Sequence, residues 1–157
     1  MAARSSKSKR RSAAKAGAKR LDDPVFFLDR NLGKKLALSI RAEGCRVEIH
    51  DDHFDEHTED VEWLGEGGKR GWIFVTKDQS ISRNQIEVVR LLESGSPAFV
   101  FTAGSVTSDE LGKAFATALP NIKKFLAKFS WPFIATITLA GRVQILVTHS
   151  GLIKRIR

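Results

Sequence analysis

Two runs of bulky apolar or β-branched residues stand out in the hydrophobic pattern of this chain. They cover residues 25–28 and 72–76. Such unbroken runs are typical of strands that are buried on both faces of a sheet. An aspartate follows each run, Asp29 after the first and Asp78 after the second. Because the carboxyl ends of parallel strands lie along one edge of a sheet, where α/β proteins bind ligands, we expect both aspartates at that edge.

Helical periodicity follows these strands. Asn31 is predicted to cap a helix in which apolar residues recur every four positions until Gly44. A short helix is expected after Thr58, and the glycine-rich residues 65–68 are expected to end it before the second buried strand. Residues 84–93 fit a third helix. Its predicted core face consists of Ile86, Val89 and Leu92 or of Val88 and Leu92.

The second half of the chain continues with one long helical segment and an alternating one. Thr107 and Glu110 have the spacing of a capping box, which opens a helix that Pro120 breaks or restarts. Residues 133–139 and 143–147 then alternate in their apolar positions. This alternation predicts an antiparallel hairpin that extends the edge of the sheet or receives a partner.

The order of these elements predicts an α/β fold. With short strands at residues 46–49 and 98–102, strands and helices alternate along the chain, which implies a mostly parallel sheet flanked by helices, with a C-terminal β-hairpin. We expect one domain, residues 21–150, between a basic disordered tail, residues 1–20, and a basic C-terminal end, residues 151–157.

The tail carries the net charge of the chain. Residues 1–20 hold eight of the 26 lysines and arginines and no acid, so the remaining basic residues balance the 18 acidic ones. A segment of this composition buries too little apolar surface to fold alone. Two interpretations stay open, a solvated tail and an arm that contacts nucleic-acid phosphates without sequence preference.

Composition also excludes several classes of protein. Cys45 is the only cysteine, which excludes disulfide frameworks, favours a reducing cytoplasm and indicates a small core residue. No apolar run approaches the length of a membrane span, so we expect a soluble cytoplasmic protein. Nucleotide-driven and serine-hydrolase chemistry are disfavoured, because no glycine-rich loop follows a strand and no Gly-x-Ser-x-Gly motif is present.

Carboxylates are the remaining candidates for chemistry. Asp60 lies near the start of the helix that precedes the second buried strand, so Asp29, Asp60 and Asp78 are expected to converge in one cleft. Like charges this close need a cation, and hard oxygen ligands suit Mg²⁺ or Mn²⁺, which also bind phosphates. Each acid also has a structural interpretation, as a turn residue or as a favourable charge at a helix start.

Four segments of the chain match a known pattern. They are Asp29-Arg30-Asn31-Leu32-Gly33, His50-Asp51-Asp52-His53-Phe54, Asp60-Val61-Glu62-Trp63-Leu64 and Arg70-Gly71-Trp72-Ile73-Phe74-Val75-Thr76-Lys77-Asp78. These segments resemble PIN-like domains, in particular the VapC-type toxin branch, and the similarity covers about residues 25–147. The resemblance implies a small Rossmann-like fold and an enzyme that cleaves RNA by hydrolysis. It also implies that Asp29, Asp60 and Asp78 bind Mg²⁺ or Mn²⁺ directly or through water.

The chain departs from the family pattern around these acids. Arg30 stands where many PIN-like relatives carry a glutamate, so a fourth acidic ligand is not assigned, and no further acid follows Asp78 closely. Lys77, Arg83 and Asn84 are weaker candidates for substrate binding, and each has a structural alternative as a solvated residue or a helix cap. Three histidines lie among acidic residues: His50, His53 and His57. They fit either a transition-metal site or a mobile acidic loop that binds no metal.

Two hypotheses for the function follow. The first is a metal-dependent endoribonuclease, the toxin of a toxin–antitoxin system, in which Asp29 and Asp78 hold an ion that activates water for attack on the phosphodiester. Asp60 would complete that site. The second is a PIN-like module that has lost activity and binds RNA or a partner protein. The candidate partners are RNA, an antitoxin protein and a second copy of the chain.

Overall fold

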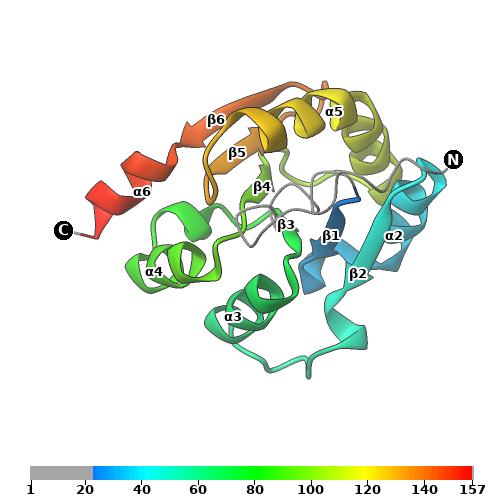
Figure 1. The fold of residues 1–157 in the computed structure, drawn as a ribbon. Helices are drawn as coiled ribbons and strands as arrows, with labels where there is room; N and C mark the ends of the chain where they lie inside the picture. Colours follow the sequence, from blue (N-terminus) through cyan, green and yellow to red (C-terminus); the bar gives the residue numbers. More distant parts are fainter. Residues whose placement is uncertain (1–22, 157) are drawn as a thin grey trace, which may run out of the picture.

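A six-stranded sheet forms the centre of the protein, whose computed structural model describes residues 23–156 (Figure 1). Its spatial order is β2-β1-β3-β4-β5-β6. The strands β1 to β5 are parallel, whereas β6 is antiparallel to β5. The predicted hairpin therefore exists and extends the edge of the sheet. The strands are β1 Val25–Leu28, β2 Arg46–Ile49, β3 Ile73–Thr76, β4 Ala98–Phe101, β5 Ile134–Ile137 and β6 Val143–Val147.

Helices cover both faces of this sheet, as the α/β class requires. They are α2 Gly33–Ala42, α3 Asp60–Arg70, α4 Gln85–Ser94, α5 Ser108–Lys128 and α6 His149–Arg155. Helices α2 and α5 lie on one face and α3 and α4 on the other (Figure 1). Successive residues of β1 point into different cores, since Phe26 packs with Phe115 of α5 and Phe27 with Trp63 of α3. Burial on both sides explains the unbroken apolar runs.

The glycines of α3 allow close packing and do not end the helix, so that prediction was wrong. The helix continues to Arg70 and ends at Gly71, whose φ of 75° is left-handed. A Cβ atom on Gly67 would lie 2.5 Å from the ring of Phe74, and one on Gly68 would lie 2.4 Å from Cβ of Ser94 in α4. The absence of these Cβ atoms lets α3 approach both the sheet and α4.

The start of α2 also differs from the prediction. Asn31 does not cap this helix. Instead, the Asp29 side chain accepts a hydrogen bond from the backbone N–H of Asn31 and caps a short 3₁₀ turn, η4 (Arg30–Leu32). Helix α2 begins only after that turn, at Gly33. The aspartate that sequence reasoning selected for chemistry therefore has a local structural role as well.

Two further helices were predicted with partly wrong details. The capping box of Thr107 and Glu110 opens α5 as predicted, but the helix runs through Pro120 without a break. Buried residues on both sides of the proline, including Leu119 and Ile122, hold that helix against the sheet. In α4 the side chain of Ile86 is 65% exposed, so the first predicted core face was wrong. The second alternative is closer, since Val88 is buried and Leu92 packs partly buried against the core, but the structure adds the buried Leu91.

Helix α6 was not predicted. It buries Leu152 in the core shared with α3 and α4, and the Arg155 guanidinium donates to the backbone carbonyl of Ser82. The basic tail, residues 1–20, lies outside the described residues. Within residues 23–156, no helix has both the length and the apolar composition that crossing a membrane requires.

Candidate active site

The order of the strands reverses at the pair formed by β1 and β3. Strand β2 lies on one side of β1 and strand β3 on the other, so the connections that leave β1 and β3 run in opposite directions along the sheet. Ligands of open α/β sheets bind at such a switch point, outside the carboxyl ends of the strands. Asp29 directly follows β1, and Asp78 lies two residues beyond β3. Both aspartates therefore lie at this edge.

A single hydroxyl group connects the two aspartates. Thr76, the last residue of β3, is 1% exposed, and its Oγ1 donates to Oδ2 of Asp29 over 2.5 Å. The same Oγ1 accepts a hydrogen bond from the backbone N–H of Asp78 over 3.0 Å. Thr76 thus aligns the carboxylate that follows β1 with the chain that follows β3.

Asp29 is buried and held on several sides. It is 7% exposed, its Oδ1 accepts from the N–H of Asn31 over 3.1 Å, and its own N–H donates to the carbonyl of Val75 over 3.0 Å. Burial of a carboxylate is tolerated when donors of this kind surround it. The contacts orient the carboxylate before any ligand arrives.

Asp78 is fixed less tightly. Its Oδ1 accepts from the N–H of Ser80 over 2.9 Å and caps the 3₁₀ turn η6 (Gln79–Ser82). This carboxylate is partly exposed. Asp29 is therefore buried and already oriented, whereas Asp78 is partly open to solvent.

The third predicted acid, Asp60, is the first residue of α3, but its side chain lies outside the described residues. Whether it joins Asp29 and Asp78 stays a prediction. Among the side chains that the structure describes, no three histidine, cysteine, aspartate or glutamate residues are placed to hold a metal ion together. The described part of the site thus consists of two acids and Thr76.

The weaker candidates for substrate binding surround Asp78. Asn84 caps α4, since its Oδ1 accepts from the N–H groups of Ile86 and Glu87, at 2.9 and 3.2 Å. Lys77 is half-buried beside Asp78, and Arg83 is exposed at the end of η6. Asn84 therefore has the structural role that was its alternative, whereas contact of Lys77 or Arg83 with a substrate stays a prediction.

Each of the three histidines of the acidic segment has a ring nitrogen within 4 Å of a different carboxylate. His53 lies 2.7 Å from Glu48 and the exposed His57 lies 3.4 Å from Glu56, both measured between Nε2 and the carboxylate oxygen. The third histidine, His50, is 2% exposed and packs between Phe27 and Phe54. This arrangement does not support a shared transition-metal site among the described residues.

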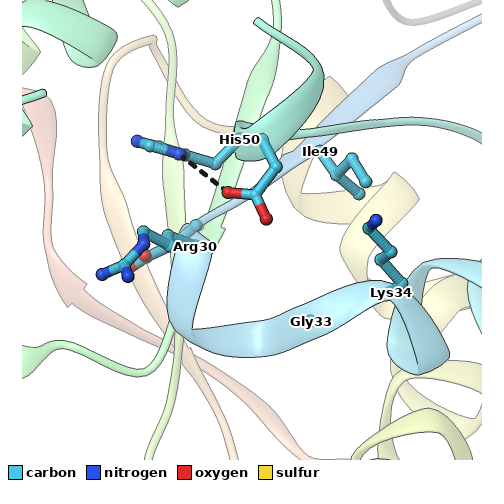
Figure 2. A pocket seen from close by; sticks show the side chains of 7 residues that line it. Arg30, Gly33, Lys34, Ile49 and His50 are labelled. Carbon is cyan, nitrogen blue, oxygen red and sulfur yellow. Dashed lines mark ion pairs between the residues drawn. The ribbon is translucent and has the colours of Figure 1, made fainter. Parts of the chain in front are cut away.

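A small pocket opens beside Asp29, at the carboxyl ends of β1 and β2 (Figure 2). Its volume of about 10 Å³ is close to that of one water molecule. Figure 2 shows the Lys34 side chain reaching toward Ile49, the last residue of β2, and the Arg30 side chain on the opposite side, below His50. The lining residues are Asp29, Arg30, Gly33, Lys34, Ile49, His50 and Asp51.

Sequence reasoning missed Thr76 as a site residue. The available signal was its position as the one polar residue in the buried strand that leads to Asp78. A buried hydroxyl in such a strand needs a hydrogen-bond partner, and the carboxyl end of a neighbouring strand is where one is found. Nothing in the spacing, however, identified Asp29 as that partner.

Comparisons with known proteins agree with this architecture. The profile of the family described as "PIN like domain" matches residues 24–103, which span β1 to β4 and both aspartates. A protein of Mycobacterium tuberculosis named "Putative ribonuclease VapC45" is 27% identical over 126 residues, which are 77% of this chain and 91% of that protein. No solved structure matches the chain.

Proposed function

The chain belongs to the PIN-like domain family, and we propose that it is a metal-dependent endoribonuclease and the toxin component of a toxin–antitoxin system. The name of the Mycobacterium tuberculosis relative supports the ribonuclease and toxin assignments. The observation that carries the proposal is the alignment of Asp29 and Asp78 by Thr76 at the switch point of the sheet. RNA is the proposed substrate and an antitoxin protein the proposed partner.

The donor set fits the cation that the family implies. Asp29 and Asp78 offer hard carboxylate oxygens, which Mg²⁺ and Mn²⁺ prefer. Asp29 and Asp78 would hold the ion, and Asp60 is proposed as a further ligand. When bound, such an ion stabilises negative charge on a phosphate and promotes ionisation of a water molecule.

Hydrogen bonds from neighbouring residues orient the Asp29 and Asp78 carboxylates. Thr76 and the N–H of Asn31 hold the Asp29 carboxylate in one direction, so no ordering is needed when the substrate arrives. The N–H of Ser80 restrains Asp78 while leaving it open to solvent, where an RNA strand would enter. Lys77 and Arg83 are proposed to contact phosphates near that opening.

RNA cleavage by the purified full-length protein tests this proposal. We expect cleavage of mixed cellular RNA in Mn²⁺ or Mg²⁺, none in chelator, and a loss of at least about 10²-fold for Asp78→Asn or Asp29→Asn. Asp23→Asn is the matched control, because Asp23 precedes β1 at the opposite edge of the sheet and, among residues 23–156, its recorded ion pair is with exposed Arg46. Equal cleavage by the Asp78→Asn and Asp23→Asn variants, or undiminished cleavage in chelator, would refute the nuclease.

A growth experiment addresses the toxin assignment. Induced expression of the wild type in a bacterial host is expected to arrest growth, and expression of the Asp78→Asn variant is not. Equal growth of the two cultures, at equal protein levels, would argue against a toxin even if cleavage is seen in vitro.

The second candidate function is an inactive PIN-like module that binds RNA or a partner protein. Arg30, which replaces an acid of the family pattern, favours it. Calorimetric titration with Mn²⁺ separates the two candidates, because an inactive module would bind RNA without binding the ion. Mn²⁺ binding that disappears in the Asp78→Asn variant would instead support the nuclease.

A further inference from the structure

One residue that lines the pocket beside Asp29 has a buried nitrogen atom that makes no hydrogen bond among the described residues. His50 is 2% exposed, and its Nδ1 makes no hydrogen bond among the described residues. The closest charged oxygen, Oδ1 of Asp51, lies 3.6 Å away, which is too far for a hydrogen bond. An unsatisfied buried polar group destabilises the folded protein, so a ligand atom that satisfies it binds with an advantage.

The size of the pocket limits that ligand atom. Its volume of about 10 Å³ leaves room inside for little more than one oxygen-sized group. A metal ion is disfavoured, because the cationic side chains of Arg30 and Lys34 line the same small pocket. An oxygen atom at the tip of a larger ligand that stays outside fits both limits.

The charges at the mouth favour an anionic ligand. Arg30 and Lys34 line the pocket from η4 and α2, and both are exposed (Figure 2). Lys34 has no acid within 4 Å in the described part of the chain. Arg30 approaches Glu56 at 3.6 Å, but about half or more of each side chain is exposed, and ion pairs of this kind are weak in water. A phosphate can therefore displace it.

The two carboxylates that line the pocket, Asp29 and Asp51, do not prevent an anion from binding there. Asp29 already accepts hydrogen bonds from Thr76 and from the N–H of Asn31. The Asp51 side chain is 57% exposed, so water screens its charge. In the tautomer that carries its proton on Nδ1 of His50, the donors available to a ligand are this N–H, the guanidinium of Arg30 and the ammonium of Lys34.

We propose that this pocket is a subsite for an RNA backbone phosphate next to the phosphodiester that is cleaved. One phosphate oxygen enters the pocket and accepts a hydrogen bond from Nδ1 of His50, while Arg30 and Lys34 neutralise the phosphate at the mouth. The inference rests on the proposed ribonuclease function, because the pocket shares Asp29 with that site. In this subsite Arg30 contacts the RNA substrate.

Lys34 and Lys35 provide a matched test. Both are exposed lysines in the first turn of α2, but only Lys34 lines the pocket. Each is changed to glutamine in the full-length Asp78→Asn protein, and the affinity for a short labelled single-stranded RNA is measured by fluorescence anisotropy in chelator at several salt concentrations. Because no cleavage is needed, the result is independent of whether the wild type is a nuclease.

For Lys34→Gln we expect the slope of log K against log salt to fall by about 0.7, which at 0.1 M salt is an affinity loss of about five-fold. Arg30→Gln should behave alike, and Lys35→Gln should leave both quantities unchanged. Equal behaviour of the Lys34→Gln and Lys35→Gln variants would overturn the subsite. A parallel titration with inorganic phosphate distinguishes the source of the ligand. Phosphate binding that depends on Lys34, with RNA affinity that does not, would also overturn it.

Discussion

Replacing Thr76 with valine tests the central contact of the site. Valine has almost the same shape but lacks the hydroxyl that joins Asp29 to the N–H of Asp78. Losing a hydrogen bond to a buried carboxylate costs about 1.5–3 kcal/mol, and the unpaired N–H adds about 0.5–1.5 kcal/mol. We therefore expect the free energy of unfolding to fall by about 2–4 kcal/mol. Thr76→Ser keeps both hydrogen bonds, loses one methyl group and should cost about 1 kcal/mol.

Urea unfolding followed by circular dichroism measures both values. A double-mutant cycle with Asp29→Ala isolates the contact itself, since valine at position 76 should cost less once the carboxylate is gone. We expect a coupling of about 1.5–3 kcal/mol between the two positions. Equal stability of the valine and serine variants, or a coupling near zero, would refute the bridging role of Thr76.

The same variants connect stability to the proposed function. At a temperature where both proteins are folded, Thr76→Val should cleave RNA about 10²-fold more slowly than Thr76→Ser, because the Asp29 carboxylate is no longer held in place. Normal cleavage by the valine variant, together with the expected loss of stability, would restrict Thr76 to a structural role.

Two further predictions concern the close contact between α3 and α4 and the thiol of Cys45. Gly68→Ala should lower the free energy of unfolding by about 1–3 kcal/mol, since its Cβ would lie 2.6 Å from Cα of Ser94; Gly65→Ala, on the open side of α3, should be neutral or stabilising in the same thermal unfolding assay. Cys45 is half-buried, and burial raises the pKa of its thiol more than nearby Lys123 lowers it. Its alkylation by iodoacetamide at neutral pH should therefore be slower than in the unfolded chain, and the unfolding free energy should decrease as the pH rises above the thiol pKa of the unfolded state.

Much of the fold was predictable because its signals are local. The unbroken apolar runs at Val25–Leu28 and Ile73–Thr76 identified the central strands, since a strand covered on both faces has no polar side. The position of Asp29 and Asp78 at one edge followed from the geometry of parallel strands. The capping box of Thr107 was equally local, because its partner Glu110 is only three residues away.

The sequence by itself thus determined the order of the elements, the buried strands and the edge at which the acids lie. Only the tertiary structure decided that the glycines of α3 face Ser94 and Phe74, that α6 completes a core, and that Thr76 joins Asp29 to Asp78. It also decided that the buried His50, whose Nδ1 makes no hydrogen bond among the described residues, lines one pocket with Arg30 and Lys34. These contacts join residues far apart in the chain, so their energies depend on how helices and strands pack, which spacing along the sequence does not encode.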